Sequence, residues 1–175
     1  MNPGLGQNLR QWHDSFSLSG AAAATLVGLI FVAASLGAGV FTREHQIGIR
    51  SFLSPTVVHF SAVLLLCLIA SVPGTWLSIG IFVVGAGLVG LGYSCLIWRL
   101  MRKHGITLTI DLIDRLWYTF FPIFAYLTVI GAGVQLTGHA LSGLGTLSFG
   151  LVLLLAIGLR NAWDMTIWVI DRRQN

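Results

Sequence analysis

His59 is the residue whose type and position most directly suggest chemistry. It lies inside a long apolar stretch, four residues and about one turn after Pro55, in the half that we assign to the cytoplasmic side. A charged histidine is costly inside a membrane, so His59 is a candidate for proton transfer, pore lining or ligand binding. The alternative is a neutral ring hydrogen-bonded to a carbonyl or hydroxyl group. Ser61 is two residues away, on another helix face, and does not form a catalytic pair with it.

A second polar group lies in the stretch from Tyr118 to Gln135. Tyr118, Pro122 and Tyr126 are spaced by four residues and are therefore expected on one helix face. Pro122 removes a backbone hydrogen bond, which predicts a kink, and irregular membrane helices occur where they line a cavity. This face either lines a pore or pocket or is a packed aromatic face with a structural kink. Together with His59, the pore or ligand candidates are Tyr118, Pro122, Tyr126 and Gln135.

The last apolar stretch ends in a short polar segment, residues 160–164. Arg160 and Asp164 are four residues apart, which predicts an ion pair within one helix. An arginine at the membrane surface also suits a lipid phosphate, with structural anchoring as the alternative. The lipid-headgroup or interface candidates are Arg99, Arg102, Arg160, Trp163 and Asp164.

Other patterns that carry chemistry are missing from the sequence. No Asp or Glu lies in the middle of an apolar stretch, which disfavours a proton pump or cation-coupled carrier. The zinc-protease, nucleophile-elbow and phosphate-loop motifs are absent, and no Cys or His cluster has metal-ligand spacing. We therefore expect no metal and no cofactor, and an enzyme is not favoured. A membrane enzyme would need its ionisable groups to converge, namely His59, Asp111, Asp114, Arg160 and Asp164.

Composition indicates the elements that position these side chains. The chain has 175 residues, of which 55% are hydrophobic and 9% charged, against about 25% charged residues in soluble domains. One membrane domain is expected, and a crossing needs about 20 apolar residues. The first apolar stretch is expected to be retained and not cleaved as a signal peptide. We predict an all-α bundle of five transmembrane helices at residues 16–41, 52–72, 75–98, 116–136 and 141–160, the last continuing to 170 beyond the inner interface.

The basic residues predict an orientation. Five crossings leave Arg10 alone on one side and place nine basic residues on the other: Arg43, Arg50, Arg99, Arg102, Lys103, Arg115, Arg160, Arg172 and Arg173. The basic side of a membrane protein is normally cytoplasmic, so the N-terminus is expected outside and the C-terminus inside. This role also explains the net charge of +4 without nucleic acid. We expect a multi-pass protein of a plasma membrane, the bacterial inner membrane.

Small residues recur every four positions in two of the apolar stretches, where they let helices approach closely. The two ridges are Gly20, Ala24 and Gly28, and Ala86, Gly90 and Ser94. They serve packing within one chain or contact between copies, and we expect a homo-oligomer embedded in membrane lipids. The leading hypothesis is a homo-oligomeric channel or passive conduit for ions or small solutes, favouring anions because its inner side is basic. The alternatives are an accessory or scaffold subunit and an enzyme acting on a lipid or quinone-like substrate.

Overall fold

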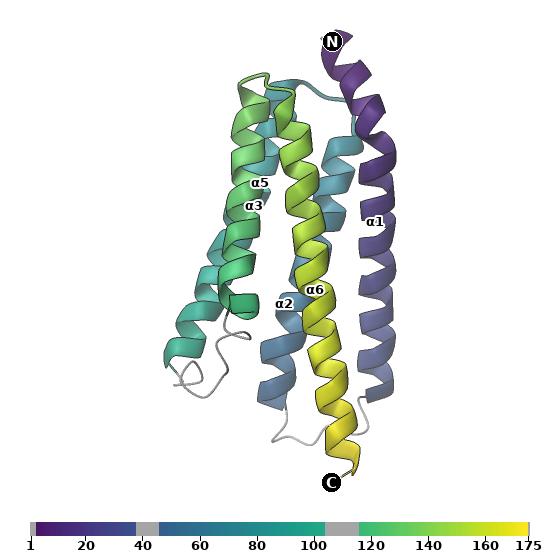
Figure 1. Ribbon diagram of the computed structural model, residues 1–175, viewed down its shortest axis with the longest axis vertical. Coiled ribbons are helices and arrows are strands. Elements are labelled where there is room, and N and C mark those ends of the chain that lie inside the picture. The colour runs from purple at the N-terminus through teal and green to yellow at the C-terminus, as the bar shows by residue number, and fades with distance from the viewer. Residues whose placement is uncertain (1–2, 38–45, 104–115, 175) are drawn as a thin grey trace.

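The computed structural model describes residues 3–37, 46–103 and 116–174, and all structural statements refer to these ranges. The described ranges are 94% helical and contain no strands, which confirms the all-α class. The elements are α1 (Pro3–Gly37), α2 (Gln46–Ser71), α3 (Trp76–Lys103), a single π-helical turn η3 (Leu116–Phe120), α5 (Phe121–Thr137) and α6 (Ser142–Gln174). Figure 1 labels the α-helices.

Four helical stretches are long and apolar enough to cross a membrane: Trp12–Ser35, Trp76–Lys103, Leu116–Thr137 and Ser142–Asp164. They indicate a multi-pass membrane protein. The fifth predicted crossing, residues 52–72, falls in α2, whose described apolar part is the shorter stretch Pro55–Ser71. The count of four helices of sufficient length is therefore one below the five that we predicted from the sequence.

The helices run further than the apolar stretches that predicted them. Apolar composition marks the part suited to lipid, whereas backbone hydrogen bonds continue until a residue breaks the helix. α1 and α2 begin before residues 16 and 52, and α6 continues to Gln174. α3 ends with Arg102 and Lys103, whose charges suit the negative end of the helix dipole. Residues 38–41 and 106–115 lie outside the described residues, so the interfacial helix considered for the latter is not described.

Two tight turns lie at the same end of the bundle, which we call the turn end. In the 72–75 turn, Ser78 Oγ accepts a hydrogen bond from the Thr75 backbone N–H at 3.0 Å. The Thr75 hydroxyl accepts one from the Ser78 N–H at 3.1 Å, so the start of α3 is capped reciprocally. In the other turn, His139 has a φ of 61°. Its ring packs edge-on against the Trp76 ring, with the two ring centroids 6.3 Å apart, and this contact joins the two turns.

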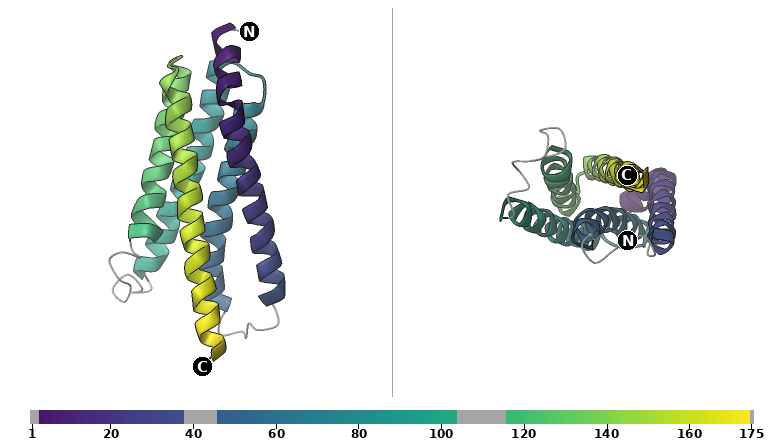
Figure 2. Two further views of the ribbon diagram at one scale, coloured as in Figure 1. Left: turned by 45° about the vertical axis from the view of Figure 1, so that its right-hand side comes forward. Right: turned by 90° about the horizontal axis from the view of Figure 1, so that it is seen from below.

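Four of the helices form a ring. α2 packs against α3, α3 against α5, α5 against α6 and α6 against α2, so α2 and α5 are diagonally opposite. α1 lies outside the ring against α2 and α6, at the side of the bundle in the end-on view of Figure 2. The described start of the chain lies at the turn end, and the C-terminal end of α6 lies at the opposite end (Figure 1).

Glycines bring α3 and α5 together. A Cβ atom added at Gly80 would lie 2.8 Å from the Gly133 carbonyl oxygen, and one added at Gly87 would lie 2.7 Å from Ile130 Cγ1. These distances are shorter than real Cβ atoms tolerate, so glycine is required for this approach. Gly90 and Ser94, from the second predicted ridge, are buried on the same helix.

The first small-residue ridge behaves differently. A Cβ at Gly20 would lie 3.1 Å from Cys67 Cβ, so this residue packs on α2. Ala24 is exposed, and nothing within the described chain lies within 4 Å of a Cβ at Gly28. Most of this ridge therefore faces away from the bundle.

Candidate functional site

His59 and Tyr126 form a buried pair in the centre of the ring. His59 Nδ1 and the Tyr126 hydroxyl oxygen are 2.9 Å apart, and the two ring centroids are 5.6 Å apart. His59 is 2% exposed and Tyr126 is fully buried. Because α2 and α5 are diagonally opposite, this hydrogen bond crosses the ring. α2 starts at Gln46, so His59 lies near the middle of the whole helix and in the first half of its apolar part, Pro55–Ser71.

Two glycines make room for this pair. A Cβ at Gly90 of α3 would collide with the Tyr126 ring, and one at Gly158 of α6 would collide with the ring of Phe60, which follows His59. At one level of the bundle, α2 and α5 therefore contribute aromatic rings and α3 and α6 contribute glycines. This alternation of large and small residues holds the His59 and Tyr126 rings in place.

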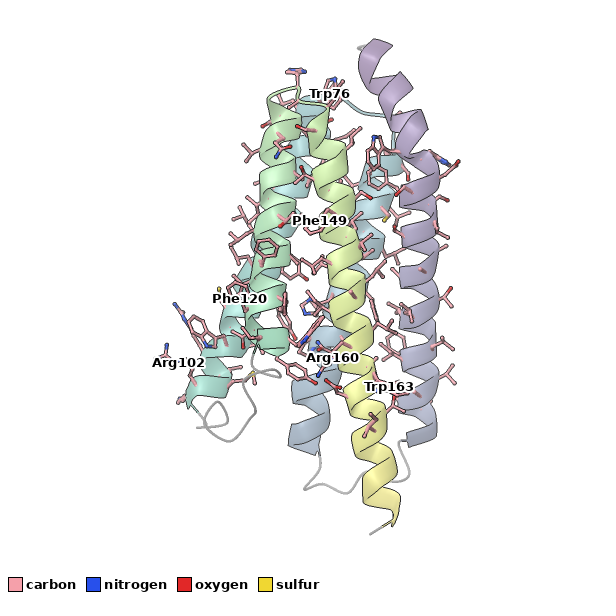
Figure 3. The ribbon with its side chains drawn as sticks, in the orientation of Figure 1. Trp76, Arg102, Phe120, Phe149, Arg160 and Trp163 are labelled. Carbon is pink, nitrogen blue, oxygen red and sulfur yellow. The ribbon has the colours of Figure 1, made fainter. Side chains whose placement is uncertain are left out.

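A second cluster lies towards the C-terminal end of the bundle. Arg160 Nε lies 3.3 Å from Asp164 Oδ2, as the four-residue spacing predicted, and the Tyr118 hydroxyl donates to the same oxygen at 3.2 Å. The Arg160 guanidinium also lies over the Trp117 ring, 5.3 Å from its centroid. Arg160 and Trp163 are labelled on the lower part of α6 in Figure 3. The cluster ties η3 to α6.

The π-helical turn separates the two tyrosines. Pro122 lacks the N–H that would bond the carbonyl four residues earlier, and the helix widens immediately before it, over Leu116–Phe120. A wider turn changes which residues share a face, so the spacing of four no longer aligns Tyr118 with Tyr126. Tyr118 bonds a residue of α6, whereas Tyr126 bonds a residue of α2. Pro122 itself is buried.

The remaining predicted candidates lie apart from His59. Gln135 is near the turn end, where its Oε1 accepts hydrogen bonds from Ser142 at 3.0 Å and Thr146 at 3.1 Å. Trp163 is 64% exposed. Arg99 is exposed on α3, and the Arg102 guanidinium lies 5.4 Å from the centroid of the Trp98 ring.

Asn161 is a buried polar residue that the sequence analysis did not single out. It is 1% exposed, and its Oδ1 has no hydrogen-bond partner in the described structure. The Thr119 hydroxyl on η3 is likewise buried without a partner. The signal for Asn161 was present in the sequence, because it continues the helical spacing of the buried residues Leu147, Leu151, Leu154 and Gly158.

The buried side of the ring changes character along its length. Towards the turn end, the described buried residues are apolar, including Val63, Leu66, Val129, Leu136, Leu144, Leu147, Leu151 and Leu154. Towards the C-terminal end they include polar residues from each ring helix: Thr56, His59, Ser94, Tyr126 and Asn161. We call the first region the apolar layer and the second the polar half. The apolar layer separates His59 and Tyr126 from Gln135.

The polar half offers neutral hydrogen-bonding groups, with one ion pair at its end. No known protein family, curated protein or solved structure matches this chain. The inference of function therefore depends on the geometry of the chain itself. The enzyme hypothesis requires Asp111 and Asp114, which lie outside the described residues. Of its other residues, His59 bonds Tyr126, whereas Asp164 accepts a hydrogen bond from Tyr118.

The His59–Tyr126 bond is testable by a double-mutant cycle. Tyr126→Phe and His59→Leu each remove one partner, and we expect a coupling of about 0.5–1.5 kcal/mol in the free energy of unfolding, measured in detergent micelles. The control cycle pairs His59→Leu with Tyr118→Phe. It should be additive, because Tyr118 bonds Asp164. Additive energies in the His59–Tyr126 cycle would contradict the bond.

Proposed function

We propose that the protein crosses the membrane five times, with its N-terminus outside and its C-terminus in the cytoplasm. α2 has 26 residues and a length of about 39 Å, which is sufficient for a crossing of about 30 Å. Seven of the nine basic residues lie on described helices towards the C-terminal end of the bundle, whereas Arg10 is the one Lys or Arg on the described residues towards the turn end. The seven are Arg50, Arg99, Arg102, Lys103, Arg160, Arg172 and Arg173. The excess of basic residues supports a cytoplasmic location for the C-terminal end, in a plasma membrane such as the bacterial inner membrane.

Within this topology, we infer that the protein is an accessory or scaffold subunit of a membrane complex. The observation that carries this inference is the apolar layer. Leu147, Leu151 and Leu154 are fully buried there and pack with Val129 of α5 and Val63 and Leu66 of α2. A path for ions or polar solutes needs polar groups along its length, and the described buried side chains of this layer are apolar. Binding, not conduction along its own axis, is the activity that this interior supports best.

The outer surface is consistent with binding in the plane of the membrane. Large apolar side chains are exposed on every long helix, among them Phe31, Leu65, Val89, Leu127 and Val152. Lipid chains or the helices of a partner are the surroundings that such a surface requires. The Arg160–Asp164 cluster and the exposed Arg99 and Arg102 would anchor the C-terminal end at lipid headgroups.

A homo-oligomeric conduit is the second candidate, and the exposed part of the α1 ridge favours it. Ala24 and Gly28 present small side chains to the outside of the bundle, and small residues allow close contact between membrane helices. The path in this case would run between copies of the chain, outside the ring that contains His59 and Tyr126. The basic inner ends would favour anions.

Ion flux separates the two candidates. We expect liposomes containing the purified protein to release chloride, potassium or protons no faster than empty liposomes, because the apolar layer closes each chain. Liposomes with an added ionophore serve as the positive control for the assay. The oligomeric state is measured in the same preparation by native mass spectrometry. Flux that rises with protein, together with a stable homo-oligomer, would refute the accessory role and favour the conduit.

A further inference from the structure

Asn161 occupies a position where the packing pattern calls for an apolar side chain. The buried residues of α6 before it are leucines, an isoleucine and glycines, and Asn161 is the first amide in this series. A buried amide oxygen without a hydrogen-bond donor is destabilising, and such atoms are few in folded proteins. The Asn161 amide oxygen therefore points to a donor that the described residues do not supply.

The register of the helices places Asn161 between the two polar clusters. Phe60 packs on Gly158, and α2 and α6 run in opposite directions. Asn161 therefore lies at about the level of Thr56, about one turn closer to the C-terminal end than the contact between Phe60 and Gly158. His59 and Tyr126 lie on its turn-end side. Tyr118 and Asp164 lie on its other side, because Asp164 follows three residues later on α6.

Thr119 is an independent second observation at the same end. Its hydroxyl is buried without a partner, and it neighbours Tyr118, which bonds Asp164 of α6. η3 packs against α6 as well as against α3 and α5. Two hydrogen-bonding atoms without partners thus belong to the polar half, one on η3 and one on α6.

We propose that the polar half is a binding site, reached from the C-terminal end, for a small neutral O–H donor that bonds Asn161 Oδ1. The donor is neutral because the two charges at the entrance, Arg160 and Asp164, already pair with each other. An anion without an O–H group has no proton to donate to Asn161 Oδ1, and a cation would find its carboxylate bonded to Tyr118. The apolar layer closes the site on the other side. Two sources supply this chemistry, namely water and the hydroxyl head of a membrane amphiphile.

This inference is independent of whether the chain is an accessory subunit or an oligomeric conduit. The site lies inside the ring of one chain, whereas both functions depend on the outer surface. Flux above that of empty liposomes would therefore not argue against the site, and an Asn161 that no reagent reaches would not argue against the accessory role.

Cysteine labelling tests the site. Asn161→Cys is made in a background with Cys67→Ala and Cys95→Ala, and the protein in nanodiscs is treated with a water-soluble methanethiosulfonate reagent. The matched control is Leu154→Cys, which lies two turns away on the same buried stripe, within the apolar layer. We expect the reagent to label Cys at position 161 and not at position 154, because it reacts with a thiolate that water can reach.

The two sources are distinguished by a competitor. For this test Thr119→Cys is made in the same background, so that Asn161 and its acceptor oxygen remain. Labelling at position 119 that 1-decanol suppresses, while decane and decanoate do not, identifies a site for a hydroxyl amphiphile. Labelling that none of the three suppresses identifies water as the donor. A second measurement guards against misfolding of the cysteine variants: 1-decanol is added to the unmodified protein and its Tm is compared with that in decane. No labelling at position 161 and no rise in Tm with 1-decanol would overturn the proposal.

Discussion

Gly90→Ala is expected to destabilise the protein by about 1–3 kcal/mol or more, although it adds a single methyl group. The added Cβ would collide with the ring of Tyr126. That ring is fully buried and bonded to His59, so it has little room to turn aside. α3 cannot retreat easily either, because Gly80 and Gly87 hold it against α5 along the same face. The measurement is the free energy of unfolding in detergent micelles.

Gly92→Ala is the matched control for this substitution. Gly92 lies two residues further along α3, is exposed, and has nothing within 4 Å of an added Cβ. Its substitution should be neutral or slightly stabilising, because alanine favours helix more than glycine does. The His59–Tyr126 coupling should also fall in Gly90→Ala and persist in Gly92→Ala. Equal stabilities for the two variants would show that α3 and α5 do not approach as closely as described.

The membrane helices were predictable because their signal is local. An apolar stretch long enough for lipid identifies a helix directly, and the predicted starts at residues 75, 116 and 141 lie within one residue of an element boundary. The polar ends of helices carry no such signal. Residues 46–51 continue α2 towards its N-terminus although they include Gln46 and Arg50, so the predicted start at residue 52 is six residues late.

The candidate site was predictable by residue type but not by partner. His59 was singled out because a histidine in an apolar stretch is unusual, and it is buried in the ring. Its partner Tyr126 lies 67 residues away on the diagonal helix, and only the packing of all four ring helices brings the two together. The expected alignment of Tyr118 with Tyr126 assumed a regular α-helix, whereas the helix has a π-helical turn before Pro122.

Asn161 shows a signal that sequence reasoning passed over. The ion-pair spacing of Arg160 and Asp164 drew attention to charge, and Asn161, which follows Arg160 directly, was treated as part of a polar segment. Counting the buried stripe of α6 from Leu147 through Leu151, Leu154 and Gly158 reaches Asn161 at helical spacing. A polar residue on the apolar stripe of a membrane helix is therefore as informative as a charged one.

Leu151→Ala is expected to lower the free energy of unfolding by about 2–5 kcal/mol, because truncation leaves a cavity in a packed interior. Leu151 is fully buried in the apolar layer, in the same cluster as Leu147, Leu154 and Val129. The loss comes from missing packing contacts, since lipid and protein interior are similarly apolar. The neighbouring Val152 is 55% exposed, so Val152→Ala is the control and should change stability by less than about 0.5 kcal/mol.

Leu151→Ala also tests whether the interior of one chain is closed to ions. In a packed layer, Leu151→Ala destabilises the protein and leaves chloride and potassium flux in liposomes at the level of empty liposomes. In a water-filled path, Leu151 would be a lining residue whose truncation costs little stability and widens the path, so flux would rise. A stable and conducting Leu151→Ala protein would therefore show that the apolar layer is not a packed barrier. His59 and Tyr126 would then be pore-lining residues. Loss of stability without flux assigns the interior of the ring to packing and binding, since a layer that must stay filled to hold the helices together cannot also be a passage.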